Sequence, residues 1–226
     1  VAVRISCGNK SSDALKQLEF SFFQAGLRKH PDYLRITGYE ELNRSTESGW
    51  GIYKHCTEEA ISRFPMSFLL ERRELHMDMS REHGVRSEAH IIRYLFGADK
   101  IPPRSKRILD ACCGYGYGTD VLAHCHPTAE VIGVDIDKDA IEYAKEIHGS
   151  NNRAQFVEQD LQDFLKRQKS DSFDAICMFE GMEHVFGVKD ILKEMNRILT
   201  SDGVFIVSVP FSWVNEQGID ENPNHV

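Results

Sequence analysis

The sequence has no run of about 18 consecutive apolar residues, the length that a membrane-spanning helix needs. It also has no basic excess: 27 lysines and arginines stand against 35 acidic residues, for a formal net charge of −8. Broad nucleic-acid-binding surfaces normally carry a basic excess. The first residues show no apolar stretch with a small-residue cleavage site, so no secretory signal is visible. These absences predict a protein with no membrane span and no nucleic-acid partner.

Cysteine occurs six times, but no pair has the CxxC spacing of a zinc or redox site. The six lie at positions 7, 56, 112, 113, 125 and 177, and the adjacent pair Cys112-Cys113 makes a poor disulfide framework. Reduced thiols are the simpler interpretation, because stable disulfides are rare in the cytosol. We therefore predict a cytoplasmic protein without a metal site.

The overall composition is ordinary for a folded protein: of 226 residues, 41% are apolar, 27% are charged and 10% are aromatic. Residues 1–100 are irregular and biased toward helix, with apolar spacing that predicts helices over 13–27, 57–65 and 67–80. One more helix is expected over 87–96, capped by Ser87 and stopped by Gly97. We predict a helical N-terminal extension or lid over 1–100 and a cofactor-binding domain over 101–226.

Strands and helices alternate with short links through the second part of the chain. Short apolar runs predict five strands, over 107–111, 130–134, 154–157, 173–179 and 204–209. Such alternation is typical of an α/β protein whose doubly wound, Rossmann-like parallel sheet is covered by helices on both faces. In these sheets the ligand binds beyond the carboxyl ends of the strands. The polar and glycine-rich segments of this chain lie at those ends.

A glycine-rich turn, Asp110-Ala-Cys-Cys-Gly-Tyr-Gly-Tyr-Gly118, follows the first of these strands and leads into a helix. Glycines let the backbone approach a ligand closely, and the helix N-terminus offers unpaired N–H groups. The glycines at 114, 116 and 118 follow a GxGxG pattern, whereas dinucleotide-binding folds use GxGxxG. The catalytic Tyr-x-x-x-Lys of many nicotinamide oxidoreductases is also absent after the fourth and fifth strands. The pattern therefore argues against a dinucleotide site.

Carboxylates end the second and third strands. Asp135 lies about 20 residues after the glycine motif, where a carboxylate can accept both hydroxyls of an adenosine ribose. The alternative, that Asp135 only caps the next helix, is weakened because Asp137 suits that role. Asp160 either accepts the adenine amino group, beside the Leu161 N–H, or caps its own helix; one residue could do both.

The fourth strand runs into Phe179-Glu-Gly-Met-Glu-His-Val185, which places carboxylates and a histidine just after a buried strand. Loops that a rigid strand positions often carry function. His184 is a candidate general base, and Glu180 is a second candidate. The alternative for His184 is a loop histidine whose ring braces the next helix.

Five segments of the sequence, taken together, resemble the class I methyltransferases that use S-adenosylmethionine; they are ILDACCGYGYGTDVLA, VIGVDIDKDAIEYAK, FVEQDLQDF, FDAICMFEGMEHV and ILKEMNRILTSDGVFIVSVP. They occur in the order and spacing of that family, and the resemblance covers about residues 86–226. The sequence is most similar to a bacterial branch associated with glycan and polysaccharide biosynthesis, and it shares the EHV segment with ubiquinone-pathway O-methyltransferases.

The resemblance implies a role for each matched position. It places the methionine end of the cofactor against the first motif, the ribose at Asp135 and the adenine against Ile136. It directs Asp160 and Leu161 to the adenine edge and the Phe179 backbone to the methionine amino group. The first-motif residues are Asp110, Cys112, Gly114 and Gly116; Cys112 stands where the family has glycine or another small residue. His90, Arg93 and Tyr94 are candidates for the methionine carboxylate, the alternative being surface residues of a lid helix.

The resemblance implies an enzyme that transfers a methyl group from S-adenosylmethionine to an oxygen or nitrogen of a small molecule or glycan. The alternative is a non-catalytic, cofactor-binding module of a larger assembly. The family sheet has seven strands, and the two that should follow the fifth are missing from residues 211–226. We therefore expect that the sequence is truncated at its C-terminus, or that the N-terminal segment or a partner covers the open sheet edge.

Overall fold

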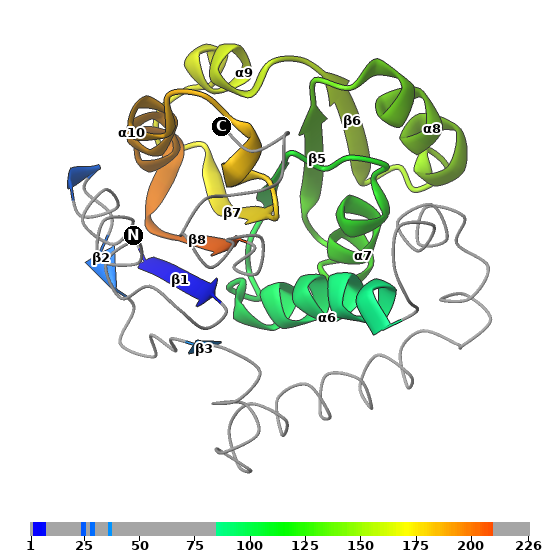
Figure 1. Cartoon of the computed structure of the whole chain (residues 1–226), viewed down its shortest axis with the longest axis horizontal. Helices are drawn as coiled ribbons and strands as arrows, with labels where there is room; N and C mark the ends of the chain where they lie inside the picture. Colours follow the sequence, from blue (N-terminus) through cyan, green and yellow to red (C-terminus); the bar gives the residue numbers. More distant parts are fainter. Residues whose placement is uncertain (1, 8–23, 26–27, 30–35, 38–84, 210–226) are drawn as a thin grey trace, which may run out of the picture.

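Five parallel strands, separated by helices along the chain, form the centre of the computed structural model, which describes residues 2–7, 24–25, 28–29, 36–37 and 85–209 (Figure 1). The strands are β4 (Arg107–Ala111), β5 (Glu130–Asp135), β6 (Ala154–Glu158), β7 (Phe173–Phe179) and β8 (Leu199–Ser208). Their spatial order is β6-β5-β4-β7-β8, and each neighbouring pair is parallel. The predicted doubly wound parallel sheet is confirmed.

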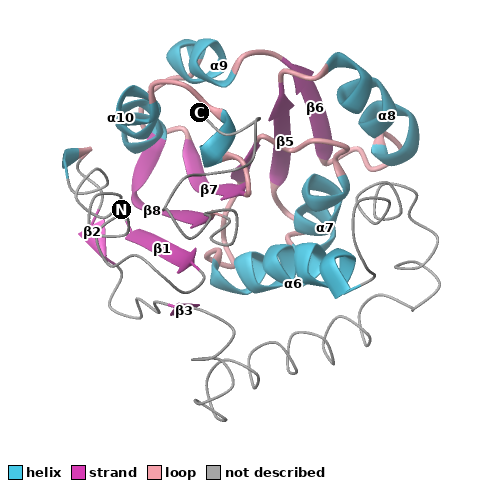
Figure 2. Ribbon diagram, viewed as in Figure 1, coloured by secondary structure: helices cyan, strands magenta, loops and turns pink. Residues whose placement is uncertain are grey.

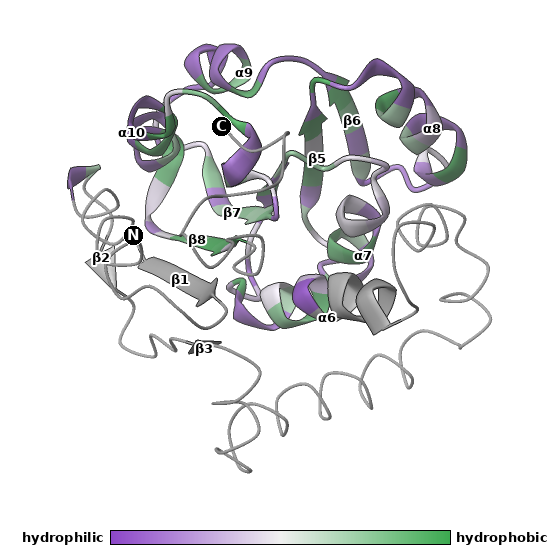
Figure 3. Ribbon diagram, in the orientation of Figure 1, coloured by the Kyte–Doolittle hydropathy of each residue, from purple (hydrophilic) through white to green (hydrophobic). Residues whose placement is uncertain are grey.

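Helices cover both faces of this sheet (Figure 2). One face carries α9 (Leu161–Arg167) and α10 (Val188–Ile198), and the other carries α6 (Val85–Lys100), α7 (Tyr117–Cys125) and α8 (Lys138–His148). Side chains alternate between the two cores along each strand: in β4, Leu109 joins the first core and Ile108 the second. Figure 3 shows the hydropathy of these layers: β5, inside the sheet, is hydrophobic over most of its length, and the covering helices α9 and α10 are mostly hydrophilic.

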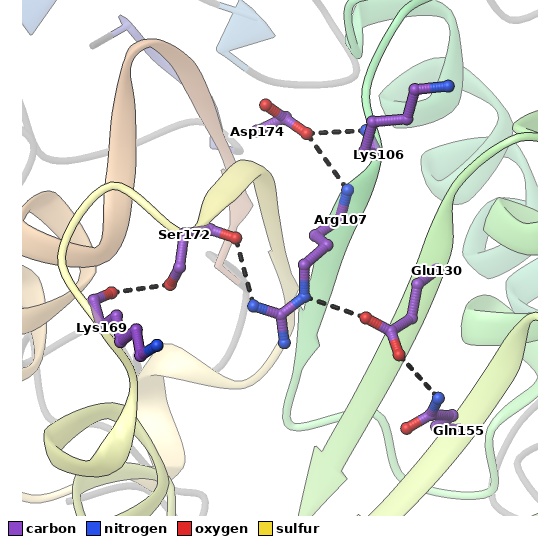
Figure 4. A network of polar contacts seen from close by, with 7 residues as sticks. All are labelled: Lys106, Arg107, Glu130, Gln155, Lys169, Ser172 and Asp174. Carbon is purple, nitrogen blue, oxygen red and sulfur yellow. Dashed lines mark hydrogen bonds and ion pairs between the residues drawn. The ribbon is translucent and has the colours of Figure 1, made fainter.

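A polar network ties the amino ends of four strands together (Figure 4). The Arg107 guanidinium donates to Glu130 at 2.9 Å and to the Ser172 carbonyl at 3.3 Å, and it lies over the Phe173 ring. Glu130 in turn accepts from Gln155 of β6 at 2.7 Å. This network lies at the edge opposite the glycine-rich turn, so we assign it to sheet register rather than to ligand binding.

Helix α6 differs from its predicted form. It begins at Val85 and continues through Gly97 to Lys100, so the expected cap at Ser87 and the expected stop at Gly97 are both wrong. Gly97 instead makes room for a neighbour, because a Cβ at this position would lie 2.7 Å from Cζ of Phe179. This tertiary contact, which the sequence does not reveal, explains the glycine inside a helix. The domain boundary at residue 100 stays a prediction, although Tyr94, on its N-terminal side, packs into the same core as α7.

The edge of β8 is covered by the N-terminal strand β1 (Ala2–Cys7), which pairs with β8 in parallel from Ala2 opposite Val204 to Ser6 opposite Ser208. The short strands β2 (Arg28–Lys29) and β3 (Ile36–Thr37) pair with β1 on its other side. The N-terminal segment was one of the covers expected from the sequence.

The helices predicted over 57–65 and 67–80, and most of the one over 13–27, lie outside the described residues. The same holds for the C-terminal segment in which the family's last strands were sought. Within the part of the chain that the structure describes, no helix has the length and apolar character needed to cross a membrane.

The packing of α6 on α7 predicts the effect of Gly118→Ala. The added Cβ would lie 1.9 Å from Cζ of the buried Tyr94 ring, an overlap that outweighs the roughly 1 kcal/mol by which alanine favours a helix over glycine. We expect the free energy of unfolding in urea to fall by about 1–3 kcal/mol. In a Tyr94→Leu background, Gly118→Ala should lower the free energy of unfolding by less, because the ring that it overlaps is gone. A Gly118→Ala variant as stable as the wild type would contradict this packing.

Candidate functional site

The glycine-rich turn between β4 and α7 holds three residues in the left-handed region of backbone conformation: Cys112 (φ 60°), Gly114 (φ 52°) and Gly116 (φ 82°). The two glycines have different surroundings. A Cβ at Gly116 would lie 2.6 Å from Cβ of Ala144 and from the Phe156 ring, so Gly116 serves helix packing. A Cβ at Gly114 would meet no atom within 4 Å. The backbone at Gly114 therefore borders open space that a ligand can fill.

Asp135 ends β5 directly beside that space. Its Oδ2 accepts the Gly114 N–H at 2.8 Å, and its Oδ1 accepts the Asp137 N–H at 2.9 Å. Asp137 caps α8 by accepting the N–H groups of Asp139 and Ala140, so the capping role predicted for Asp137 is confirmed. Asp135 therefore joins the end of β5 to the glycine-rich turn and is not the cap of α8. The next residue, Ile136, is 71% exposed.

Asp110 lies beneath the turn and is fully buried. Its two carboxylate oxygens accept the Thr119 hydroxyl at 2.7 Å and the Tyr94 hydroxyl at 3.0 Å. Burial raises the pKa of Asp110 from 3.8 to about 7, with the charge of Asp135 adding to the rise and the two hydrogen bonds opposing it. The carboxylate thus holds α6 and α7 to the end of β4. Its predicted place in the methionine cradle stays a prediction, and any influence on a ligand passes through the turn above it.

Tyr94 has surroundings that the sequence did not predict. It is buried, its ring packs edge-on against Phe179 at 4.8 Å between centroids, and its hydroxyl is committed to Asp110. The expected role as a surface residue is therefore wrong, and the contact with the methionine carboxylate stays a prediction. The third glycine of the motif, Gly118, could have indicated the burial of Tyr94, because only a residue without a Cβ leaves room for this ring.

At the end of β6, Asp160 accepts the Asp163 N–H at 3.1 Å and caps α9, which is one of the two roles expected for it. Its contact with adenine stays a prediction, and the exposed side chain leaves room for it. Leu161 is buried in the core beneath, so only its backbone is available for the predicted contact.

Carboxylates surround the Cys112 thiol. Burial raises the pKa of this thiol far above its ordinary value, and the charges of four acidic residues raise it further: Asp135, Asp110, Glu183 and Asp160. The thiol is therefore protonated and a poor nucleophile at neutral pH. Acidic side chains at this edge of the sheet favour a ligand that carries positive charge. Among the described residues, no group of histidine, cysteine and acidic side chains is arranged to hold a metal ion.

The two candidate bases have different surroundings at the end of β7. Glu180, with φ 52°, accepts the Ser208 hydroxyl at 2.7 Å, and the same oxygen lies 3.7 Å from Nε of Arg93. His184 lies in the short 3₁₀ helix η1 (Met182–His184), and its side chain is 44% exposed, with Nε2 3.8 Å from the Glu183 carboxylate. His184 is thus the more accessible of the two. Ser208 carried no sequence signal, because nothing in a strand-ending serine predicts its partner.

Comparison with known proteins gives concordant findings. A family model described as "Methyltransferase domain" matches residues 103–224, more than half of the chain. A demethylmenaquinone methyltransferase of Staphylococcus aureus is 32% identical over 104 residues, which is 46% of this chain and 42% of that relative. The chain thus spans less than half the length of this relative. The fold resembles the crystal structure of a SAM-dependent methyltransferase from Archaeoglobus fulgidus, with a TM-score of 0.52 and 19% identity, covering 69% of this chain and 66% of that one.

The buried Asp110 predicts a pH-dependent contribution to stability. Its pKa is higher in the folded than in the unfolded chain, so its contribution is fully present below about pH 4 and is lost as the pH rises to about 7. Asn at this position cannot titrate. The free energy of unfolding of the wild type minus that of Asp110→Asn should therefore fall by about 2–4 kcal/mol from pH 4 to pH 7.5. Urea unfolding at matched pH measures it, and a constant difference would contradict the raised pKa.

Proposed function

The chain belongs to the class I methyltransferases that use S-adenosylmethionine, and from this premise we propose that it transfers a methyl group from that cofactor to an oxygen or nitrogen nucleophile of a small molecule or glycan. The observation that carries the proposal is the hydrogen bond between Asp135 and the Gly114 N–H beside open space. It supports the proposal because the Asp135 carboxylate would accept the ribose hydroxyls and the Gly114 backbone, which borders that space, would let the methionine end approach.

The described residues fit the cofactor. Asp135 would accept the ribose hydroxyls, the exposed Ile136 would pack on the adenine, and Asp160 with the Leu161 N–H would meet the adenine edge. Gly114 and Gly116 would border the methionine end, with Asp110 and Cys112 supporting the turn and Phe179 offering its backbone to the amino group. The carboxylates around Cys112 favour a group that carries a sulfonium and an ammonium.

S-adenosylmethionine, when bound, supplies an electrophilic methyl group on its sulfonium. The protein then has to hold the acceptor in line with that methyl group and keep water away. If the acceptor is a hydroxyl, a base assists by removing its proton. We propose His184 for this role, with Glu180 as the other candidate, because both follow the end of β7 next to the turn.

Two classes of acceptor are proposed. The sequence resemblance favours a glycan or a phenolic ring hydroxyl of the ubiquinone-pathway type. The Staphylococcus aureus relative is named for demethylmenaquinone, which supports a ring compound rather than a glycan as the first class of acceptor to test. Binding of the cofactor without transfer to any acceptor would favour a non-catalytic module instead.

Asp135→Ala tests the cofactor site. Two charge-assisted hydrogen bonds to ribose are each worth about 1.5–3 kcal/mol, so S-adenosylhomocysteine should bind at least about tenfold more weakly. Calorimetry measures this affinity. The matched control is Asp137→Ala, which removes the cap of α8 and should lower the melting temperature with little change in affinity. If the two variants lost affinity equally, the proposed contact between Asp135 and the ribose would be contradicted.

His184→Ala tests the proposed base. With a phenolic or sugar hydroxyl acceptor that the wild type methylates, the single-turnover rate should fall by about 10²–10⁴-fold. The affinity for S-adenosylhomocysteine should stay within about twofold, because the imidazole serves the acceptor and not the cofactor. If His184 only braces the loop, the affinity and the melting temperature fall instead, and the rate per bound cofactor does not change.

A further inference from the structure

Three consecutive residues at the end of β7 each contact a different part of the site. The Phe179 ring packs against α6, where it contacts Tyr94 and fills the space beside Gly97. Glu180 is bound to the end of β8, and Gly181 lies against the glycine-rich turn. The position of this short segment therefore determines how α6, β8 and the turn are placed relative to one another.

Ser208, the last residue of β8, holds the middle of this segment at two points. Its carbonyl accepts the Glu180 N–H at 3.0 Å, and its hydroxyl donates to the Glu180 carboxylate at 2.7 Å. Ser208 is 2% exposed, so this hydroxyl bond to a charged group is shielded from water. Glu180 has φ 52°, a conformation that a residue with a Cβ adopts only when its surroundings enforce it. The bonds to Ser208 are part of that enforcement.

The contact between Gly181 and Cys112 passes any movement of this segment to the glycine-rich turn. A Cβ at Gly181 would lie 2.7 Å from Cβ and 3.2 Å from Sγ of Cys112, so the Gly181 backbone packs against the Cys112 side chain without spare room. Cys112 itself has φ 60° and lies two residues before Gly114, where the cofactor is proposed to bind. A shift of Glu180 would press on or release this contact, because closely packed atoms transmit displacement.

We propose that Ser208 is a positioning residue of the cofactor site, which acts through Glu180 to hold Gly181 against the glycine-rich turn. This inference rests on the proposed function, since the turn is taken as part of the cofactor site. It also gives Glu180 a role as an anchor between β8 and Arg93 of α6, which leaves His184 as the base for a hydroxyl acceptor.

The experiment compares Ser208→Thr with Ser208→Val, whose side chains have the same shape and differ in the hydroxyl. Calorimetry with S-adenosylhomocysteine should show affinity close to wild type for Ser208→Thr and at least about fivefold weaker binding for Ser208→Val, the lower end of ordinary coupling between sites. Because Ser208 acts through Glu180, the difference between the two variants should disappear in a Glu180→Ala background. If Ser208 had only a structural role, the affinities of Ser208→Thr and Ser208→Val would not differ in a way that depends on Glu180.

A second pair of variants tests the same hydrogen bond by changing its acceptor, Glu180. This pair replaces the first if either Ser208 variant does not fold. Glu180→Gln keeps an oxygen that can accept the hydrogen bond from the Ser208 hydroxyl, whereas Glu180→Leu does not. Glu180→Gln should therefore bind S-adenosylhomocysteine at least about fivefold more tightly than Glu180→Leu. Equal affinities within each pair, or a Thr–Val difference that persists without Glu180, would overturn the role of Ser208. If the wild type itself bound no S-adenosylhomocysteine, the proposed function would fail, and this inference would fail with it.

Discussion

Close contact between glycine backbones and neighbouring side chains, at the carboxyl ends of β4, β5 and β7, is the constraint on which the rest of the structure depends. Gly114 has to come within hydrogen-bonding distance of Asp135, and Gly181 has to lie directly against Cys112. Cys112, Gly114 and Glu180 take positive φ angles around these contacts, and Gly181 has no room for a Cβ. The strained turns persist because the two packed cores of the sheet and the buried bonds of Asp110 hold the strand ends in place.

Much of this arrangement follows from the sequence, and physical chemistry explains which parts. The strands were foreseen because each contains a short apolar run, and alternation with helices leaves few topologies open. The start of β8 at Leu199, five residues before the predicted position 204, was not foreseen. The cap of α8 was foreseen because an aspartate such as Asp137, just before a helical pattern, accepts N–H groups that have no other partner. These features are local, and local sequence specifies them.

The features that sequence missed all depend on contacts between distant segments. Gly97 reads as a helix stop in isolation, and only the ring of Phe179, packed against it, explains why the helix continues. Tyr94 reads as a surface residue of a lid, and its bond to Asp110 joins residues 16 positions apart. Ser208 and Glu180 are 28 positions apart and have no motif in common. Helix α6 accordingly belongs to the packing of the site as much as to any cover over it.

We propose that this edge of the sheet binds S-adenosylmethionine and not a dinucleotide. The most direct measurement is a calorimetric titration of the unmodified chain with S-adenosylhomocysteine and, in parallel, with NAD. We expect saturable one-to-one binding of S-adenosylhomocysteine and no heat of binding with NAD. Saturable binding of NAD, with no response to S-adenosylhomocysteine, would contradict it.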